Sequence, residues 1–372
     1  MQNRRQLIKG AAGLALISST RGLWLSHAAA ASTEDLVAAA KAAGQTKVVV
    51  PAGTGVYHQT LKELFYDPFT KDTGIETVLY SAGSYSEVQA KVRAMSEANN
   101  MEWDIISPTS DTVQSPAFAN YLENLGDCSE LSNVVSEGMD GSCLGKAVLW
   151  SSAGAGLAYD ENAFPNGGMK GWADFWDVKA FPGPRSLPNV GIPWQVLSAA
   201  LVADGVEPKD VYPLDVDRAF RKLDELKPHI AAWWTSGDHS VQLFRSKEVV
   251  ASMLWNGRAA SLRNDGFPIS FVWNGAMLDA DALGIIKGAP HPIAAKALLN
   301  YLYSRPEAGA EFVKRLNYVL PNKHIGDFLD ANMRSNLMTA PQNWPNIVKS
   351  DAVWLAENRE KLIERWTAWI SG

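Results

Sequence analysis

Short apolar segments of strand type alternate with helical segments along most of this chain, and that alternation restricts its fold more than any other feature. A β-branched run at 47–50 precedes a glycine turn at 51–55, and helical spacing then places Leu61, Leu64 and Phe65 on one side. Further strands are expected at 75–80, 103–107, 147–150, 156–159, 249–255 and 269–273. Further helices are expected at 36–43, 88–98, 194–204, 217–226, 293–303, 306–316 and 351–370. The pattern predicts an α/β fold in which helices cover mostly parallel sheets.

The length of the chain favours two such units. It has 372 residues, of which 47% are hydrophobic, which is enough for more than one core. Two α/β units leave a cleft between them, and small ligands of such proteins bind at the carboxyl ends of strands. This rule directs attention to the segments 52–57, 107–111, 233–238 and 255–257.

The N-terminal segment predicts export. A basic start is followed by an apolar run over 10–25 and by alanines at 28–31. Residues 3–9 are typical of the twin-arginine export signal, and an ordinary secretory signal remains the alternative. We expect the segment 1–30 to be removed near Ala30 and the mature protein to be periplasmic. No later stretch has the ~20 uninterrupted apolar residues of a membrane span, so no membrane insertion of the mature chain is expected.

The balance of charges argues against a nucleic-acid partner. Without the basic residues of the signal, which are Arg4, Arg5, Lys9 and Arg21, the chain keeps 30 basic and 40 acidic residues. An acidic chain of this kind repels phosphate backbones and suits a cationic ligand.

The two cysteines, Cys128 and Cys143, predict one disulfide. They lie in a stretch rich in Gly, Ser and Asp without a histidine nearby, and an oxidising compartment favours their pairing. Closing a loop of about 15 residues contributes on the order of 3 kcal/mol in the chain-entropy estimate. A metal site is the weaker interpretation, because two thiolates do not complete a tetrahedral shell.

The motifs of cofactor and metal enzymes are missing from the sequence. The glycine turns at 53–55 and 154–156 lack the third glycine of a dinucleotide fingerprint, and no Walker-type Gly-Lys-Ser/Thr follows a glycine turn. The six histidines are scattered without a metal-ligand spacing, and no Gly-x-Ser-x-Gly elbow is present. We therefore expect no cofactor, no metal site and no enzymatic activity.

Several short segments, in their order along the chain, carry a family resemblance. They are 172–177 with Phe181-Pro182-Gly183, then 212–220, Trp233-Trp234-Thr235-Ser236-Gly237 and Trp255-Asn256-Gly257-Arg258. Together with 318–322 and the tryptophan-rich final helix, they resemble the spermidine/putrescine-type solute-binding proteins of ABC importers. The resemblance runs from about residue 47 to the C-terminus.

This resemblance implies a two-lobed, Venus-flytrap fold of the periplasmic binding protein type, whose lobes close on a ligand by rigid-body rotation. Crossover strands form the implied hinge. Lobe 1 takes 31–152 and 280–325, and lobe 2 takes 153–279 and 326–372. The implied partners are a small amine ligand and the membrane permease of an ABC importer, and a monomer is expected.

The resemblance also implies a set of ligand-binding residues. Trp255 corresponds to an aromatic wall of the cleft, and Asp281 corresponds to the acid that takes a ligand ammonium. The other cleft-facing loops contribute Thr54, Tyr57, Thr109, Ser110, Ser236 and Asp238. Trp233 and Trp234 also lie near acids, where an indole face favours a cation by ~0.5 to 2 kcal/mol. Asp279 is a further candidate ligand-binding residue. Core packing remains the alternative for the two tryptophans, and a helix cap or a solvated turn remains the alternative for Asp238 and Asp279.

Two departures from the family bear on the ligand. Arg185 stands where polyamine binders of this kind place a second acidic cluster, and Asp279 stands where some relatives carry an aromatic residue. A diamine needs an acid at each end, because an unpaired desolvated ammonium costs several kcal/mol. Arg185 can instead fork onto a carboxylate, with a salt bridge as its alternative role. A polyamine, an ω-amino acid and a quaternary amine therefore remain open as ligands.

Two further function classes remain open. Twin-arginine export is often used for proteins that fold around a cofactor, so a periplasmic enzyme is one alternative. A sensory module that presents the loaded protein to a chemoreceptor has the same fold and is the other. The sequence favours a binder of a polyamine-like amine for an importer over both.

Overall fold

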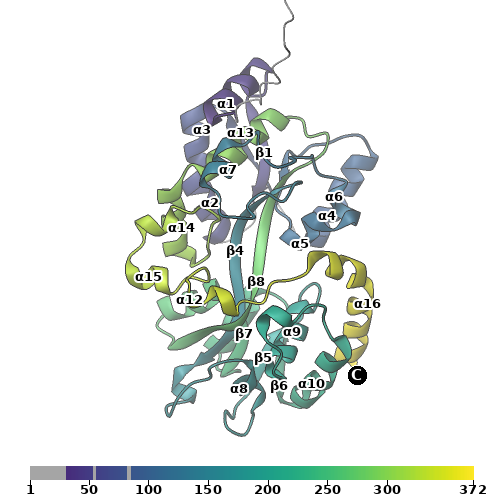
Figure 1. Ribbon diagram of the computed structural model, residues 1–372, viewed down its shortest axis with the longest axis vertical. Coiled ribbons are helices and arrows are strands. Elements are labelled where there is room, and N and C mark those ends of the chain that lie inside the picture. Colours follow the sequence, from purple (N-terminus) through teal and green to yellow (C-terminus); the bar gives the residue numbers. More distant parts are fainter. Residues whose placement is uncertain (1–30, 53–55, 82–84) are drawn as a thin grey trace, which may run out of the picture.

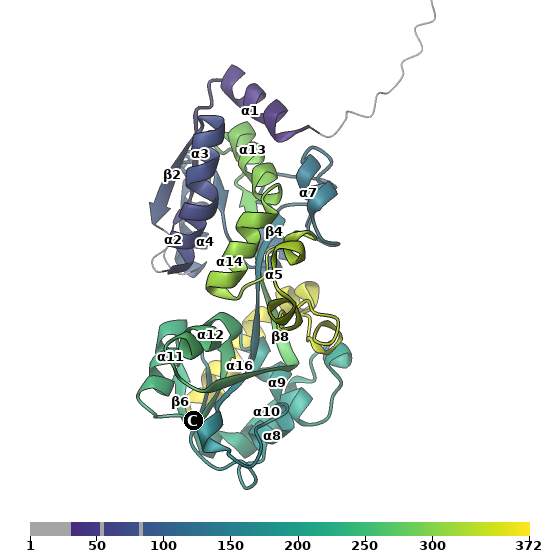
Figure 2. The ribbon, with the colours of Figure 1, turned by 90° about the vertical axis from the view of Figure 1, so that its left-hand side faces the viewer.

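The computed structural model describes residues 31–52, 56–81 and 85–372. Two lobes are joined by two long strands, β4 (Val148–Asp160) and β8 (Ile269–Ile285), which run through the middle of the molecule (Figure 1). A view from the side shows the same two strands passing from the upper lobe to the lower one (Figure 2).

The pairing of β4 with β8 is antiparallel and belongs to both lobes. Register shifts interrupt the ladder between Leu149 and Ser152 and again between Ala155 and Leu157. Between these irregular places the pairing continues, so the backbone itself links the lobes.

The first lobe has a small parallel sheet covered by helices. Its strands are β1 (Lys47–Ala52), β2 (Glu76–Ser81) and β3 (Ile105–Ile106). Its helices are α1 (Thr33–Ala42), α2 (Val56–Leu61), α3 (Asp67–Thr73), α4 (Tyr85–Glu97), α5 (Ser110–Gln114), α6 (Pro116–Ala119), α7 (Ser132–Glu137), α13 (Pro292–Tyr303), α14 (Pro306–Leu316) and α15 (Ala331–Ser335). β1 pairs with β2 in parallel, whereas β3 pairs antiparallel with β8. The three strands predicted for this part of the chain are confirmed.

A buried carboxylate joins β1 to the rest of the first lobe. The backbone N–H of Asp104 donates to the carbonyl of Val49 at 3.1 Å, and the N–H of Val49 donates to Asp104 Oδ2 at 2.7 Å. Asp104 is fully buried, and its Oδ1 also accepts from the backbone N–H of His291 at 2.7 Å. The Nδ1 atom of that histidine lies 2.9 Å from Oδ2. Because His291 precedes α13, one side chain ties β1 to the start of this helix.

The second lobe continues the sheet of the hinge strands. Its strands are β5 (Arg185–Pro188), β6 (Ile230–Trp234) and β7 (Ala251–Trp255). Its helices are α8 (Trp172–Trp176), α9 (Trp194–Ala203), α10 (Val216–Leu226), α11 (Gly237–Arg245), α12 (Asn256–Asn264) and α16 (Ala352–Ser371). The strand order is β3-β8-β4-β7-β5-β6, in which β7, β5 and β6 are parallel. None of the helices in the described part of the chain has the length and hydropathy of a bilayer-spanning segment.

The amphipathic helix α10 illustrates how apolar spacing shapes this lobe. The residues predicted to share its apolar face, Ala219, Phe220, Leu223 and Leu226, are all buried. They pack in the same core as α8, α9 and the C-terminal helix α16. The face predicted from the sequence is therefore confirmed.

Each lobe has its own hydrophobic core. After β4 and β8 the chain passes between the lobes a third time, and the two cores show where. The sequence analysis ends the first lobe at residue 325. Leu329 and Leu337 nevertheless pack with β1, α13 and α14 in the core of the first lobe. Val348 packs in the core of the second lobe and forms a bridge with Met277 of β8. The chain therefore returns to the second lobe between Leu337 and Val348, later than the sequence indicated.

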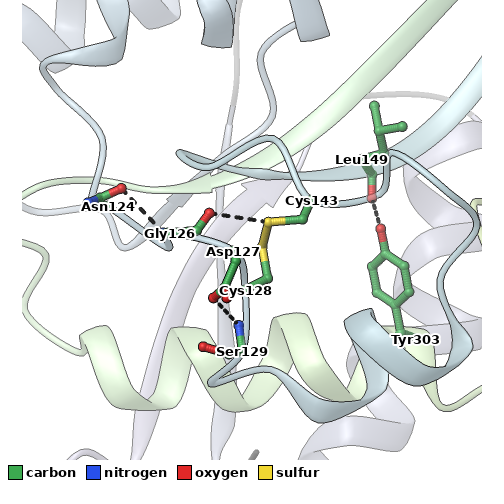
Figure 3. The surroundings of a disulfide bond; sticks show 8 residues. All are labelled: Asn124, Gly126, Asp127, Cys128, Ser129, Cys143, Leu149 and Tyr303. Atoms are coloured by element: carbon green, nitrogen blue, oxygen red, sulfur yellow. Dashed lines mark hydrogen bonds between the residues drawn. A yellow bond between two sulfur atoms is a disulfide. The ribbon is translucent and has the colours of Figure 1, made fainter.

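The predicted disulfide between Cys128 and Cys143 is confirmed (Figure 3). Cys128 is fully buried and packs in the core of the first lobe. Cys143 forms a bridge with Val148, the first residue of β4. The disulfide therefore fixes an irregular loop to the base of the hinge.

The role of Asp104 predicts a large stability effect. Asp104→Ala removes the acceptor of buried N–H groups, so we expect the free energy of unfolding to fall by about 3 kcal/mol or more. Urea denaturation followed by circular dichroism measures this change. Asp140→Ala, which removes an exposed carboxylate of the same lobe, is the control and should change stability by less than about 0.5 kcal/mol. Equal effects of the two substitutions would contradict the role assigned to Asp104.

Candidate ligand-binding site

Polar and aromatic side chains from both lobes meet at the middle of the hinge strands. We call the following set the hinge cluster: Tyr57, Ser151, Trp255, Arg258, Asp279, Asp281 and Tyr318. Asp279 and Asp281 are two residues apart on β8, so their side chains leave the same face of the strand. Ser151 comes from the neighbouring strand β4. The sheet therefore supplies the fixed part of the cluster, and the two lobes supply the rest.

Tyr57, Ser151 and Asp281 form a hydrogen-bonded chain on the side of the first lobe. The hydroxyl of Ser151 donates to Asp281 Oδ2 at 3.2 Å and lies 2.9 Å from the phenol oxygen of Tyr57. Because the Ser151 hydroxyl uses its hydrogen in the bond to Asp281, the phenol of Tyr57 is the donor in the bond between Tyr57 and Ser151. Burial raises the pKa of Tyr57 well above its usual value, and the charge of Asp281 adds to this shift. The phenol therefore stays protonated at neutral pH.

Trp255 is the aromatic residue that the second lobe contributes. It is the last residue of β7 and directly precedes α12, and it is half-buried. Its indole N–H donates to Asp279 Oδ2 at 2.7 Å. Its ring packs edge-on against Trp234, with 5.2 Å between the ring centroids. The orientation of the indole is thus fixed from two sides.

Arg258 is a member of the cluster that the sequence analysis did not select. It lies in the first turn of α12, and its Nη1 donates to Asp238 Oδ1 at 2.8 Å. Its Nε is buried and has no hydrogen-bond partner among the residues that the structure describes. A Cβ atom at Gly237 would lie 2.5 Å from this Nε, so the glycine allows the guanidinium to pass close to the start of α11. A cation in the first turn of a helix opposes the helix dipole, and that unfavourable placement was the available sequence signal.

Tyr318 lies among the charges of the cluster. Burial raises its pKa to about 12; the charge of Arg258 opposes this shift, and the charges of Asp279 and Asp281 add to it. The ring packs closely on α12, because a Cβ at Gly257 would lie 2.5 Å from it. One cation and two acids therefore surround a neutral phenol, an arrangement that offers a partner to each charge of a small ligand.

The structure brings Thr109 close to this cluster. Thr109 precedes α5 and forms a β-bridge with Asp281, and its hydroxyl lies 2.9 Å from that of Thr112. Ser110 begins α5 and is half-buried. Thr54, predicted beside Tyr57, lies outside the described residues.

Ser236 and Asp238 are engaged in local interactions of α11. The hydroxyl of Ser236 caps this helix by accepting from the N–H of His239 at 3.1 Å. Asp238 is exposed and reaches the cluster only through its ion pair with Arg258. Among the described residues, no group of His, Cys, Asp or Glu is arranged to hold a metal ion.

The structure does not bring Trp233 and Trp234 to the cluster as ligand walls. Successive residues of a strand face opposite sides, and Trp233 packs edge-on against Trp366 of α16 at 5.4 Å. Trp234 is 1% exposed, and its indole N–H donates to the carbonyl of Met253 at 3.1 Å. Both belong to packed interiors, and Trp234 acts at the cluster only by supporting Trp255.

Arg185 is also placed away from the cluster. It begins β5, whereas the parallel strands β5 and β6 end at Pro188 and Trp234. Its side chain is fully buried, lies over the ring of Phe175 at 5.3 Å and donates to the carbonyl of Phe181. The structure thus gives the interpretation of Arg185 as a carboxylate ligand no support, and Arg258 is the guanidinium whose charge acts on Tyr318 together with those of Asp279 and Asp281.

The other face of the hinge has a different character. A hollow of about 510 Å³ lies between α12, α14 and α15, with Trp273 in its lining. The ring of Trp273 packs on Gly154 of β4. The preceding residue, Ala153, points to the opposite face of the strand and pairs with Asp279 of β8. Asn256 also lines this hollow, and its side chain accepts from the N–H of Gly154 at 2.9 Å and donates to the carbonyl of Asn317.

Comparison with known proteins places this geometry in context. Residues 65–339 match the family described as bacterial extracellular solute-binding protein. The gamma-aminobutyric acid-binding protein of Pseudomonas aeruginosa is 31% identical over 344 residues, which cover 90% of this chain and 93% of that protein. Spermidine/putrescine-binding periplasmic protein 1 of Haemophilus influenzae is 27% identical over 276 residues, which cover 70% and 74%. The binding protein AttC of Agrobacterium tumefaciens C58, solved in an open unliganded conformation, is 35% identical with a TM-score of 0.73, and the match covers 87% of this chain and 99% of AttC.

The burial of Asp279 predicts a pH dependence of stability. Burial raises its pKa above the ordinary 3.8, with the charge of Asp111 adding to the shift and hydrogen bonds from Trp255 and Gln195 opposing it. A carboxyl group with a raised pKa favours the folded state below its unfolded pKa and loses that contribution as the pH rises through the folded value. Asp279→Asn, which stays neutral, should therefore become more stable relative to the wild type as the pH rises.

Urea denaturation of both proteins without ligand, between about pH 3.5 and 7, measures this difference. The difference between their free energies of unfolding should rise with pH and then level off. A difference that is flat or falls with pH would contradict the desolvation of Asp279.

Proposed function

The chain belongs to the bacterial extracellular solute-binding proteins, and from this premise we propose that it binds a small ω-amino acid between its lobes and delivers it to an ABC importer. The resemblance to the spermidine/putrescine-type binding proteins and the two-lobed fold that it implied are confirmed. Such a protein carries its ligand without transforming it, so binding without turnover is part of the proposal.

The observation that carries the proposal is that the charges of Arg258 and Asp281 both act on the same buried phenol, Tyr318. Within the described residues, the Nε of Arg258 is buried and has no hydrogen-bond partner. A carboxylate suits such a guanidinium best, because its two oxygens accept from two N–H groups at once. Asp281, on the side of the first lobe, supplies a carboxylate for an ammonium group. A ligand with one positive and one negative end therefore satisfies both sides, and an α,ω arrangement of these ends suits residues from different lobes.

The aromatic members of the cluster fit the middle of such a ligand. Trp255, Tyr57 and Tyr318 offer rings against which methylene groups pack, and an ammonium near an indole face gains ~0.5 to 2 kcal/mol. The two phenols have raised pKa values, so they stay neutral and keep their hydroxyl groups as hydrogen-bonding groups.

A polyamine is the second candidate ligand. It is favoured by the presence of two acids, Asp279 and Asp281, on one face of β8, and by the name of the Haemophilus relative. Arg258 counts against it, because the second ammonium of a diamine would approach a guanidinium of the same sign. The name of the Pseudomonas relative, a gamma-aminobutyric acid-binding protein, agrees with the zwitterion.

The compartment and the partners complete the proposal. The segment 1–30 acts as an export signal of the twin-arginine type and is removed near Ala30, which leaves a periplasmic protein. The mature protein acts as a monomer that presents its loaded form to the permease. Family members are extracellular or periplasmic, and this supports the proposed location.

A ligand panel tests the proposal directly. We expect 4-aminobutyrate and 5-aminovalerate to bind more tightly than putrescine, spermidine or choline in isothermal titration calorimetry. A ligand at 100 times its Kd adds about 2.7 kcal/mol of stability, which a thermal-shift assay detects. Each ligand should be recovered unchanged after incubation with the protein. Binding confined to neutral sugars or phosphate would contradict the proposal, and chemical turnover would contradict the role as a carrier.

Substitution of Arg258 separates the two candidate ligands. Arg258→Ala should weaken 4-aminobutyrate binding at least about thirtyfold, equivalent to ~2 kcal/mol, without weakening putrescine binding. Gly237→Ala should cause a smaller loss of the same kind, because its Cβ displaces the guanidinium. The control is Arg245→Ala, which removes an exposed arginine paired with Asp265. Unchanged 4-aminobutyrate affinity in Arg258→Ala would rule out the carboxylate role of this residue.

A further inference from the structure

Asp279 and Asp281 look alike in the sequence, yet the structure gives them different partners. Asp281 accepts a hydrogen bond from the hydroxyl of Ser151 on the side of the first lobe. Asp279 accepts the indole N–H of Trp255, which belongs to the second lobe, at 2.7 Å. The side chain of Gln195 on α9 also lies near Asp279 and lowers its pKa. Two carboxylates on one face of one strand are therefore directed at different groups.

We propose that Asp279 is a positioning residue, which holds the ring of Trp255 in place and does not bind the ligand ammonium. This inference rests on the proposed function, because it assigns a role within the same site. It limits the site to a single place for an ammonium, at Asp281. The pair Asp279–Trp255 therefore helps the protein to select ligands with one positive charge over diamines.

The geometry of Trp255 supports this role. An indole has two rotatable bonds, and two contacts suffice to fix them: the edge-on packing against Trp234 at 5.2 Å and the hydrogen bond to Asp279. Because the bond at 2.7 Å has a carboxylate acceptor, it belongs to the stronger, charge-assisted kind. Without it, a half-buried indole N–H would lack its acceptor, and the ring would be free to turn away from the ligand.

The surroundings of Asp279 also disfavour a role as an ammonium ligand. Its Oδ2 already accepts the indole N–H of Trp255, and the side chain of Gln195 also lies near the carboxyl group. Burial and the nearby charge of Asp111 raise its pKa, so its negative charge is less favourable than that of an exposed carboxylate. The guanidinium of Arg258 is part of the same cluster and would repel a second ammonium. A hydrogen-bond acceptor for the indole is what this position requires.

Two substitutions at Asp279 distinguish the acceptor from the charge. Asp279→Asn keeps an oxygen that accepts the indole N–H and removes the charge, whereas Asp279→Leu removes both. We expect the affinity for 4-aminobutyrate to stay within about threefold of the wild type in the asparagine variant and to fall about tenfold or more in the leucine variant. The asparagine variant thus serves as the conservative rescue. Isothermal titration calorimetry gives the affinities, and urea denaturation shows that each variant is folded.

A third variant keeps the test independent of the folding of Asp279→Leu. Trp255→Phe removes the N–H donor while Asp279 stays in place, and it should weaken 4-aminobutyrate binding. In this background Asp279→Asn should have no further effect, because no indole N–H is left for residue 279 to hold. Equal losses in Asp279→Asn and Asp279→Leu would show that the charge binds the ligand and would overturn the inference. So would an unchanged affinity for 4-aminobutyrate in Trp255→Phe. If the wild type binds none of the amines, the proposed function itself has failed, which is a separate and recognisable result.

Discussion

The long antiparallel pairing of β4 with β8 is the constraint on which the rest of this structure depends. Both strands pass from the core of one lobe into that of the other, so backbone hydrogen bonds connect the lobes directly. The irregular register on either side of Ser152 marks the places where such a ladder bends most readily. Because Asp279 and Asp281 lie on the same stretch of β8, the acids stay at the pivot however the lobes are oriented.

The remaining members of the hinge cluster divide between the lobes in a way that links ligand capture to lobe movement. Tyr57 and Asp281 belong to the first lobe, whereas Trp255 and Arg258 are carried by β7 and α12 of the second. The proposed zwitterionic ligand gains its full set of contacts only when the residues of the first lobe and those of the second lobe both approach it. Its binding free energy therefore favours the closed arrangement to the extent that it contacts both lobes there.

Local patterns in the sequence suffice for most strands and helices, because each depends on residues a few positions apart. They do not show which face of a strand meets the ligand, and so Trp233 and Trp234 appear equivalent to Trp255 until packing separates them. The distance of Arg185 from the hinge depends on where β5 begins and in which direction it runs. Arg258 belongs to one of the family motifs, but its importance follows from its place beside Tyr318 in the folded chain, which no local pattern shows.

The first lobe is not a continuous piece of the chain, and this determines the order in which the molecule can be assembled. Asp104 meets its partner His291 at a separation of 187 residues, and Val48 and Val50 share a core with α13 and α14. During synthesis the first lobe cannot pair this acid or complete its interior until residues beyond His291 have left the ribosome. The segment between the hinge strands contains most of the second lobe and can collapse earlier. The part of the protein that is made first therefore cannot complete its fold until a segment 187 residues further along the chain has been made.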